Sequence, residues 1–227
     1  MSNGLLKHYK MDQLIFKFPF AKKYYEQDFF VSSNNFSAFK LVESWPTWSS
    51  KWLNIFGATG SGKTHLSKIL QKKIDKTKLI DARNINNEII QDLNQFNCLI
   101  IDNFNNNIEE KLFYSILNES KQLENYVLIN SIHSIKNINF NLTDLKSRIT
   151  SFLYIGIELP TDDLLKVIIS KTLSDNQISL NPKILDYIIN NVERSYEKMF
   201  KFLKDVDELS LSTGKSININ LIKKILK

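Results

Sequence analysis

The stretch GATGSGKT, residues 57–64, constrains the fold of this chain more than any other segment. It matches the pattern GxxxxGK[ST] and lies between an apolar run, KWLNIFG, and an amphipathic run, HLSKILQKKI. A strand that enters a glycine-rich turn and continues as a helix directs backbone N–H groups toward an anion at the helix N-terminus. The sequence therefore predicts a phosphate-binding loop, with an incidental glycine turn as the alternative.

Apolar runs that alternate with amphipathic runs predict the surrounding architecture. Strands are expected at 51–57, 78–81, 98–102, 126–130 and 152–159, and helices at 65–74, 84–93 and 109–123. Several of these strands are apolar throughout, which is typical of a parallel sheet covered by helices on both faces. We expect an α/β fold built on a five-stranded parallel sheet.

The pattern changes at Pro160, after which only helices are expected. They fall at 161–173, 181–192, 197–209 and 218–226. We therefore divide the chain into an extended N-terminal tail (1–24), a nucleotide-binding base domain (25–159) and a small helical lid domain (160–227).

Composition limits the partners and the compartment. The formal net charge of +6 comes mostly from lysines scattered along the 227 residues, which is weak support for direct nucleic-acid binding. The single cysteine, Cys98, lies in an apolar run and cannot form an intramolecular disulfide, which fits a reducing compartment. No window reaches the roughly 20 apolar residues that a membrane span needs, so we expect a cytoplasmic protein without membrane contact.

The loop and the strand that ends at Asp102 supply the expected nucleotide and magnesium site. The nucleotide-binding candidates from the loop are Gly57, Ala58, Thr59, Gly60, Ser61, Gly62, Lys63, Thr64 and His65. Lys63 is expected to reach the terminal phosphates, and the Thr64 hydroxyl to join the Mg²⁺ shell. Asp102 is expected to organise the same ion, the alternative being an ordinary acid that opens a loop at a strand end.

Two asparagines follow strand ends near this site. Many ATPases with this loop carry a second acid after the magnesium-organising one, but this chain has Asn103, which can hold a water but cannot take its proton. Asn130, with Ser131 beside it, is a candidate sensor of the terminal phosphate, although polar residues are common at strand ends. We expect ADP or ATP with Mg²⁺ as cofactors, slow hydrolysis, and no structural metal, because the histidines and the cysteine lack metal-ligand spacing.

Four segments resemble the DnaA-related AAA+ ATPases. DFFVSSNNFSAFKLV (28–42) is similar to the segment that enters that family's nucleotide domain, GATGSGKTHL to its phosphate loop and TDLKSRI (143–149) to its arginine motif. With the short tail and DNQISLNPKILDYIINNVERSYEKM (175–199), the chain is most similar to the Hda-type regulators. This resemblance implies an AAA+ base with a lid, and a protein that promotes hydrolysis of DnaA-bound ATP once the replicative clamp is on DNA. It implies the ATP form of DnaA and the sliding clamp as partners, with indirect DNA contact and a homodimer as a further option.

The same resemblance gives Arg148 a role as an arginine finger that reaches the nucleotide of a neighbouring subunit. A planar fork of donors can contact two oxygens of the transferring phosphoryl group, which lysine cannot copy. Such a finger raises the rate of hydrolysis by a factor of roughly 10³ to 10⁵. From the residues alone, the alternative is a helix-surface arginine paired with Asp144 at i−4.

The other two arginines are less clearly assigned. The family's lid arginine aligns with Glu197, so its role falls to Arg194 or Lys198, or is absent. The alternative for Arg194 is an ion pair with a neighbouring glutamate. Arg83, after the strand 78–81, is given no role.

Within the tail, Gln13, Leu14, Phe16 and Phe18 resemble the clamp-binding peptide of Hda proteins. An extended peptide of this kind inserts apolar side chains into a groove; an arm folded onto the protein's own core is the alternative. Two other functions are kept for the whole chain. One is a DnaA-like or helicase-loading AAA+ protein that binds single-stranded DNA, and the other is a nucleotide-binding adaptor without chemistry.

Overall fold

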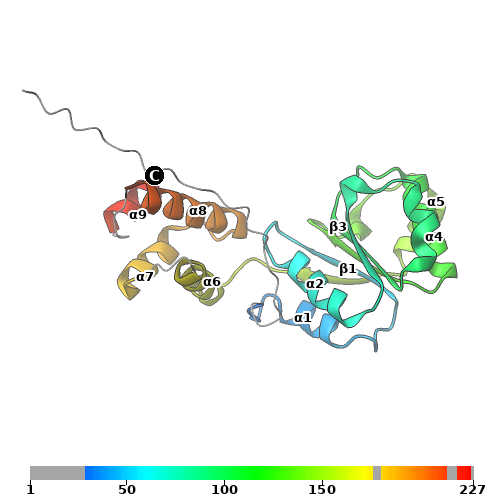
Figure 1. Ribbon diagram of the computed structural model, residues 1–227, viewed down its shortest axis with the longest axis horizontal. Helices are drawn as coiled ribbons and strands as arrows, with labels where there is room; N and C mark the ends of the chain where they lie inside the picture. The colour runs from blue at the N-terminus through cyan, green and yellow to red at the C-terminus, as the bar shows by residue number, and fades with distance from the viewer. Residues whose placement is uncertain (1–28, 176–179, 214–218, 226–227) are drawn as a thin grey trace, which may run out of the picture.

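Five parallel strands form the centre of the protein, as seen in a computed structural model that describes residues 29–175, 180–213 and 219–225 (Figure 1). The strands are β1 (Trp52–Gly57), β2 (Thr77–Asp81), β3 (Cys98–Phe104), β4 (Tyr126–Ser131) and β5 (Leu153–Ile157). They are arranged in the order β2-β3-β4-β1-β5, and every neighbouring pair is parallel. The predicted α/β fold with a five-stranded parallel sheet is confirmed.

Helices cover both faces of this sheet. They are α1 (Phe36–Glu43), α2 (Lys63–Lys73), α3 (Glu88–Asp92), α4 (Glu110–Gln122) and α5 (Thr143–Ile149). The helix expected at 84–93 is broken into α3 and short 3₁₀ turns at 82–84 and 93–95. The break has a local cause, because Asn86 Oδ1 accepts a hydrogen bond from Glu88 N at 3.1 Å and so starts α3 only there.

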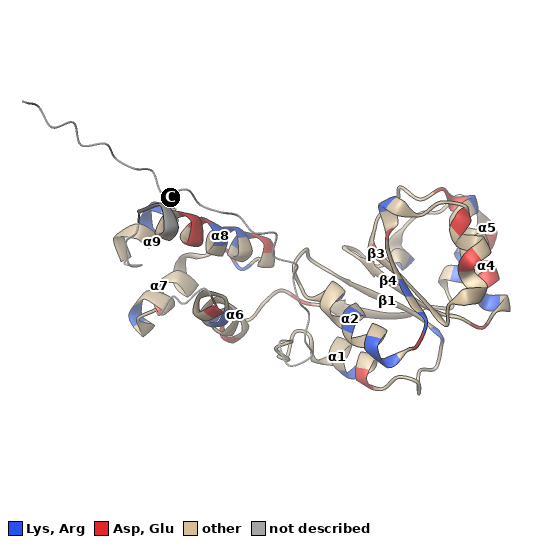
Figure 2. Ribbon diagram, viewed as in Figure 1, with Lys and Arg blue, Asp and Glu red and all other residues tan. Residues whose placement is uncertain are grey.

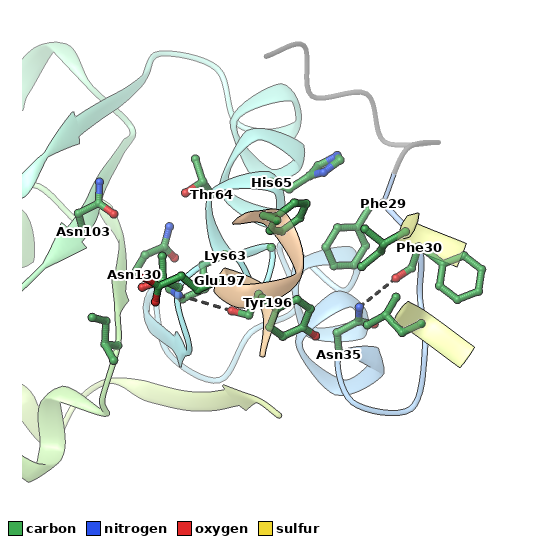
Figure 3. Close-up of a pocket in the computed structure, with 18 of the residues that line it drawn as sticks. Phe29, Phe30, Asn35, Lys63, Thr64, His65, Asn103, Asn130, Tyr196 and Glu197 are labelled. Carbon is green, nitrogen blue, oxygen red and sulfur yellow. Dashed lines mark hydrogen bonds between the residues drawn. The ribbon is translucent and has the colours of Figure 1, made fainter. Parts of the chain in front are cut away.

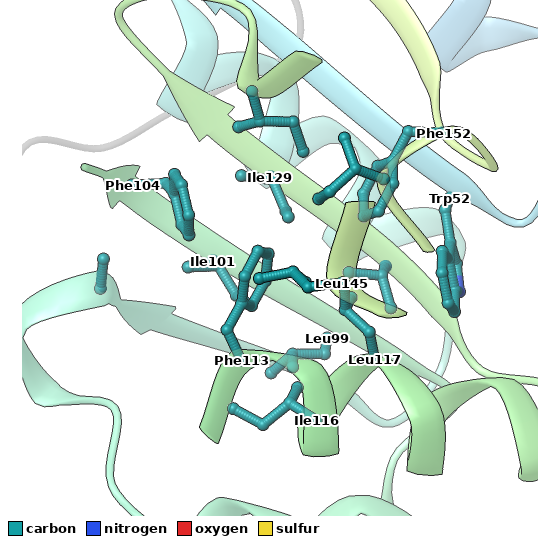
Figure 4. Close-up of a cluster of buried hydrophobic side chains, with 14 of the residues drawn as sticks. Trp52, Leu99, Ile101, Phe104, Phe113, Ile116, Leu117, Ile129, Leu145 and Phe152 are labelled. Atoms are coloured by element: carbon teal, nitrogen blue, oxygen red, sulfur yellow. The ribbon is translucent and has the colours of Figure 1, made fainter. Parts of the chain in front are cut away.

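Alternation along the strands divides the core between the two faces. Leu99 and Ile101 of β3 pack with Phe113 of α4 and with residues of α5 in a single buried cluster (Figure 4). Cys98 and Ile100, which alternate with these residues along β3, pack on the other face with α1 and α2. Successive side chains of a strand point to opposite faces, so α4 and α5 lie across the sheet from α1 and α2.

The chain after β5 is helical in the described residues. Its helices are α6 (Asp162–Asp175), α7 (Pro182–Asn191), α8 (Tyr196–Thr213) and α9 (Ile219–Ile225), and they share their own buried cluster. The Asn181 side chain accepts a hydrogen bond from Lys183 N and Pro182 occupies the first turn, which together set the start of α7. None of the described helices is both long and apolar enough to cross a membrane. Lysines and arginines are spread over both parts of the chain (Figure 2).

Asn34 joins the sheet-containing base to these helices. This buried side chain donates hydrogen bonds to the carbonyl of Glu158, just after β5, and to the hydroxyl of Tyr196 at the start of α8. Glu158 N in turn donates to the carbonyl of Asn34 at 3.1 Å. Burial raises the pKa of Tyr196 to about 12, so its hydroxyl remains protonated at neutral pH. The start of α8 is thereby held next to the phosphate loop.

Candidate functional site

A cavity of about 1070 Å³ lies where the loop, the sheet ends and the helical part meet (Figure 3). Its lining includes residues 59–65, the residues after β2, β3 and β4, and parts of α6 and α8. This volume is near the upper end of the roughly 300 to 1,000 Å³ of small-molecule and cofactor sites. The cavity can therefore hold a ligand as large as a nucleotide.

The loop backbone is in close contact with aromatic side chains. Gly60 and Gly62 have φ angles of 83° and 98°, in the left-handed region that glycine adopts without strain. A Cβ at Gly60 would lie 3.0 Å from Tyr196 Cβ, and one at Gly62 would lie 2.9 Å from the Phe29 ring. Both the conformation and the space therefore require glycine.

Lys63 lies across this loop at the start of α2. Its Nζ donates hydrogen bonds to the carbonyls of Gly57 at 2.7 Å and Ala58 at 2.8 Å. Burial lowers the pKa of Lys63, and the nearby carboxylate of Asp102 opposes that shift. A cation held in this position would contact phosphate oxygens cradled by the loop.

On the polar side of the cavity, Asp102 accepts hydrogen bonds from three other residues. Its Oδ2 accepts a hydrogen bond from Thr64 Oγ1 at 2.8 Å, and its Oδ1 accepts from Asn130 Nδ2 at 2.9 Å and from Asn103 N at 3.0 Å. Asn130 is fully buried and also donates to Ser67 Oγ at 2.7 Å. The structure thus brings together the side chains of Thr64, Asp102 and Asn130 and the backbone of Asn103, four residues that the sequence predicts to share a site. Adjacent carboxylate and hydroxyl oxygens beside a phosphate loop are the donor set that Mg²⁺ prefers, so these residues fit the ion.

A second group of polar residues continues from Asp102. Asn103 has a φ angle of 56°, and its Nδ2 donates to Asp81 Oδ2 at 2.7 Å. Asp81 also accepts from Arg83 Nε at 2.8 Å and from an Arg83 terminal nitrogen at 3.0 Å. Arg83 and Asn103 line the cavity. Sequence reasoning missed Arg83, because its position in the cavity wall depends on its hydrogen bonds to Asp81. Asp81 is the register partner of Asp102 in the neighbouring strand.

The helical part does not bring the expected cation to the cavity. Arg194 is outside the lining, and its guanidinium forms an ion pair of 3.0 Å with Asp162 at the first turn of α6. Lys198 also pairs with an acid, since its Nζ lies 3.8 Å from Glu193 Oε2. Glu197 lines the cavity instead, which places an acid where the lid arginine was expected.

An apolar wall completes the cavity. Phe29, Phe30 and Phe200 supply aromatic rings, and Ile132 and Ile168 supply aliphatic surface. These side chains are suited to holding the flat ring of a nucleobase. No sequence pattern predicted this wall, because its members come from four separate segments. His65, a predicted nucleotide-binding residue, packs edge-on against Phe29 with ring centroids 5.2 Å apart.

Arg148 lies on α5 and does not line this cavity. One of its terminal nitrogens donates to Asn118 Oδ1 of α4 at 2.8 Å, and its buried Nε has no hydrogen-bond acceptor within the described part of the chain. Among the residues that the structure describes, it forms no ion pair with Asp144, the partner in the alternative interpretation. Arg148 is half-buried, and its guanidinium is bonded to a neutral amide.

The start of α5 is fixed by a neighbouring helix. Glu110 of α4 accepts hydrogen bonds from Asn141 N at 2.8 Å and from Leu142 N at 2.7 Å. These two bonds lower the pKa of Glu110, so the carboxylate remains charged at neutral pH. Arg148 thus belongs to a helix that is held at both ends against α4.

The predicted clamp-binding residues Gln13, Leu14, Phe16 and Phe18 lie outside the described residues.

Comparisons with known proteins found similarity to replication proteins. The family model described as "Hda, lid domain" matches residues 162–226. The chromosomal replication initiator DnaA of Borreliella burgdorferi is 26% identical over 247 residues, which cover 93% of this chain and 49% of that protein. The chain thus spans about half the length of the curated relative.

Solved structures agree on the fold. Domain III of Thermotoga maritima DnaA matches with a TM-score of 0.75 and 17% identity, over 92% of this chain and 98% of that one. A DnaA structure described as bound to AMPPCP and single-stranded DNA matches with a TM-score of 0.65 and 20% identity, over 85% of this chain and 66% of that one. The fold is that of an AAA+ domain followed by helices. More narrowly, the matches support an AAA+ protein related to DnaA and Hda.

Asn130 Nδ2 lies 2.9 Å from Asp102 Oδ1, so a negative charge at position 130 should destabilise the fold. Asn130→Asp would bring two buried carboxyls together, and one of them would keep its proton above the pH of about 3.9 at which an unfolded aspartate ionises. The pKa of such a carboxyl is higher in the folded protein than in the unfolded chain. Its contribution to stability is fully present below the pKa of the unfolded chain, and it is lost as pH rises through the pKa of the folded protein. We expect a deficit in unfolding free energy of about 2 to 4 kcal/mol at pH 8 that shrinks at pH 5.

Chemical denaturation at both pH values measures this deficit. Asn130→Leu, which is uncharged and of similar size, is the control and should show the same deficit at pH 5 and pH 8. A deficit for Asn130→Asp that does not change with pH would contradict the arrangement around Asp102.

Proposed function

We propose that this protein is a negative regulator of replication initiation that binds the DNA-loaded sliding clamp and stimulates hydrolysis of DnaA-bound ATP through Arg148. The observation that carries the proposal is a guanidinium that lies away from its own nucleotide cavity and has only a neutral side-chain partner among the described residues. The similarity of the helical part to the Hda lid supports the same conclusion. In this proposal the protein's own nucleotide is structural, and the chemistry occurs on a partner.

ADP or ATP with Mg²⁺ is the proposed ligand of the cavity. The loop and Lys63 would hold the phosphates, Thr64 and Asp102 would hold the ion, and the apolar wall would hold the base. A bound Mg²⁺ would neutralise phosphate charge. Asn103, in place of an acid, supports slow turnover because an amide does not accept a proton.

Substitution of Lys63 tests nucleotide binding. Lys63→Ala removes the cation at the phosphates, and loss of a charge-assisted bond of about 1.5 to 3 kcal/mol weakens affinity roughly 10- to 150-fold. Isothermal titration with Mg-ADP and Mg-ATP measures this effect. Lys68→Ala is the matched control, since Lys68 is on the same helix, outside the cavity lining, with Nζ 3.1 Å from Gln71 Oε1. Equal affinities for the two variants would contradict the assignment.

Arg148 is suited to act on a neighbouring molecule. Its helix packs on the face of the sheet opposite α1 and α2, and in Figure 1 α4 and α5 lie at the far end from α6 to α9. A carboxylate partner would neutralise the charge of the guanidinium. The amide of Asn118 orients the guanidinium but does not neutralise its charge. An uncompensated, partly desolvated cation interacts strongly with an approaching phosphate.

Substitutions of Arg148 test the arginine finger. Arg148→Ala should lower stimulation of DnaA-bound ATP hydrolysis by roughly 10³-fold or more, while affinity for nucleotide stays unchanged. Arg148→Lys should rescue little, because an ammonium cannot make the forked contact. Arg194→Ala, which removes an arginine paired with Asp162, is the control and should keep the stimulation. A non-catalytic adaptor would tolerate both Arg148 substitutions, and that outcome would refute the finger.

Clamp binding is proposed for the tail residues Gln13, Leu14, Phe16 and Phe18, and rests on sequence resemblance. Replacing Gln13 and Leu14 together by alanine should weaken capture by the purified sliding clamp at least about tenfold, because anchor side chains carry most of the energy of such a peptide. A control with His8 and Lys10 replaced by alanine changes the same tail outside the peptide. Undiminished capture of the first variant would show that clamp binding lies elsewhere.

A second candidate function is a DnaA-like protein that binds single-stranded DNA. It is favoured by the match to the DnaA structure whose description includes single-stranded DNA. The spread of basic residues in Figure 2 favours the regulator instead, because a strand-binding groove concentrates positive charge. Tight, salt-dependent binding of single-stranded DNA by the isolated protein would favour the second candidate.

A further inference from the structure

Three polar side chains at the ends of β2 and β3 form a chain of hydrogen bonds that leads into the cavity. Arg83 binds both carboxylate oxygens of Asp81, and Asp81 accepts from the side chain of Asn103. Arg83 and Asn103 line the cavity, but Asp81 does not. A substitution of Asp81 can therefore influence a ligand only through one of these neighbours.

Asp81 is held as a charged, acceptor-only group. Its Oδ1 also accepts from Arg83 N at 3.0 Å, so the same carboxylate starts the 3₁₀ turn at 82–84. The hydrogen bonds from Arg83, and then the one from Asn103, hold the pKa of Asp81 well below its usual range. An ionised carboxylate has no proton to donate. It can bind an amide only through the amide nitrogen.

This restriction fixes the orientation of Asn103. Because Nδ2 faces Asp81, Oδ1 is turned the other way, and Figure 3 shows that oxygen on the side where Thr64 and Asn130 lie. The backbone of Asn103 is held as well, since its N–H donates to Asp102 Oδ1 at 3.0 Å. The position after Asp102 thus presents a hydrogen-bond acceptor to the cavity.

We propose that Asp81, clamped by Arg83, is a positioning residue that holds Asn103 as the acceptor for the water that attacks the terminal phosphate of bound ATP. This inference rests on the proposed function, in that the cavity takes a nucleoside triphosphate. The water oxygen bonds to the γ-phosphorus, and the bond from that phosphorus to the β–γ bridging oxygen breaks, with its electron pair leaving on ADP. The water protons pass to the released phosphate and to solvent, because an amide orients water without taking a proton. With the opposite orientation, Asn103 would donate to a phosphate oxygen instead.

Single-turnover cleavage of Mg-ATP by the full chain tests the proposal, together with affinities for Mg-ADP and Mg-AMPPCP. The proteins are wild type, Asp81→Ala, Asn103→Ala and the double variant. Asp81→Ala is expected to slow cleavage about tenfold through misplacement of the water, while the affinity for Mg-ADP changes less than about twofold. In the Asn103→Ala background, Asp81→Ala should have no further effect, because both residues act through one interaction.

Two further variants separate positioning from folding. Asp92→Ala is the matched control, since Asp92 is exposed and outside the cavity lining, and it should cleave ATP at the wild-type rate. Asp81→Asn keeps the size of the side chain but can both donate and accept, so it should give an intermediate rate even if Asp81→Ala folds poorly.

An equal loss of rate from Asp81→Ala with and without Asn103 would overturn the positioning role. Wild-type protein that binds Mg-ATP but never cleaves it would also overturn it, because no water would then be activated. Failure of the wild type to bind either nucleotide would refute the proposed nucleotide site and this inference with it.

Discussion

The carboxylate of Asp102 is the interaction on which the site depends. It accepts hydrogen bonds from Thr64 on α2, from Asn130 on β4 and from the backbone of Asn103 at the end of its own strand. Three elements that are distant in sequence are thereby held within one polar cluster beside the phosphate loop. A buried charge of this kind is stable only when its acceptor positions are occupied, which explains why polar residues gather there.

The fold and this cluster could be predicted from the sequence because both follow from local patterns. Strand periodicity and the glycine loop set the sheet and the start of α2, and residues that end parallel strands necessarily meet at one edge. Arg83 could not be assigned in this way, because its place in the cavity wall depends on a hydrogen bond to Asp81. The position of Arg194 was also beyond local reasoning, since it is determined by an acid 32 residues earlier in the chain. Phe29 and Phe200 line one cavity only because the helical part packs against the base.

Two contrasting features of the structure are compatible with the proposed action on a partner. The cavity has a loop, a magnesium-compatible donor set and an apolar wall, but an amide where a proton-accepting acid is usual. Arg148, in contrast, lies on another face and is oriented by Asn118, and no acid of the described residues forms an ion pair with it. A domain that holds its own nucleotide with slow turnover, and offers a charged fork elsewhere, is suited to complete the site of a second molecule.

The most direct test of the proposed regulator is reconstitution of DnaA-bound ATP hydrolysis with this protein, the sliding clamp and DNA, each omitted in turn. We expect fast hydrolysis only when all three components are present, because the clamp on DNA concentrates the protein next to DnaA and Arg148 supplies the charge. Hydrolysis that proceeds at the same rate without this protein, or that this protein leaves unchanged with clamp and DNA present, would contradict it.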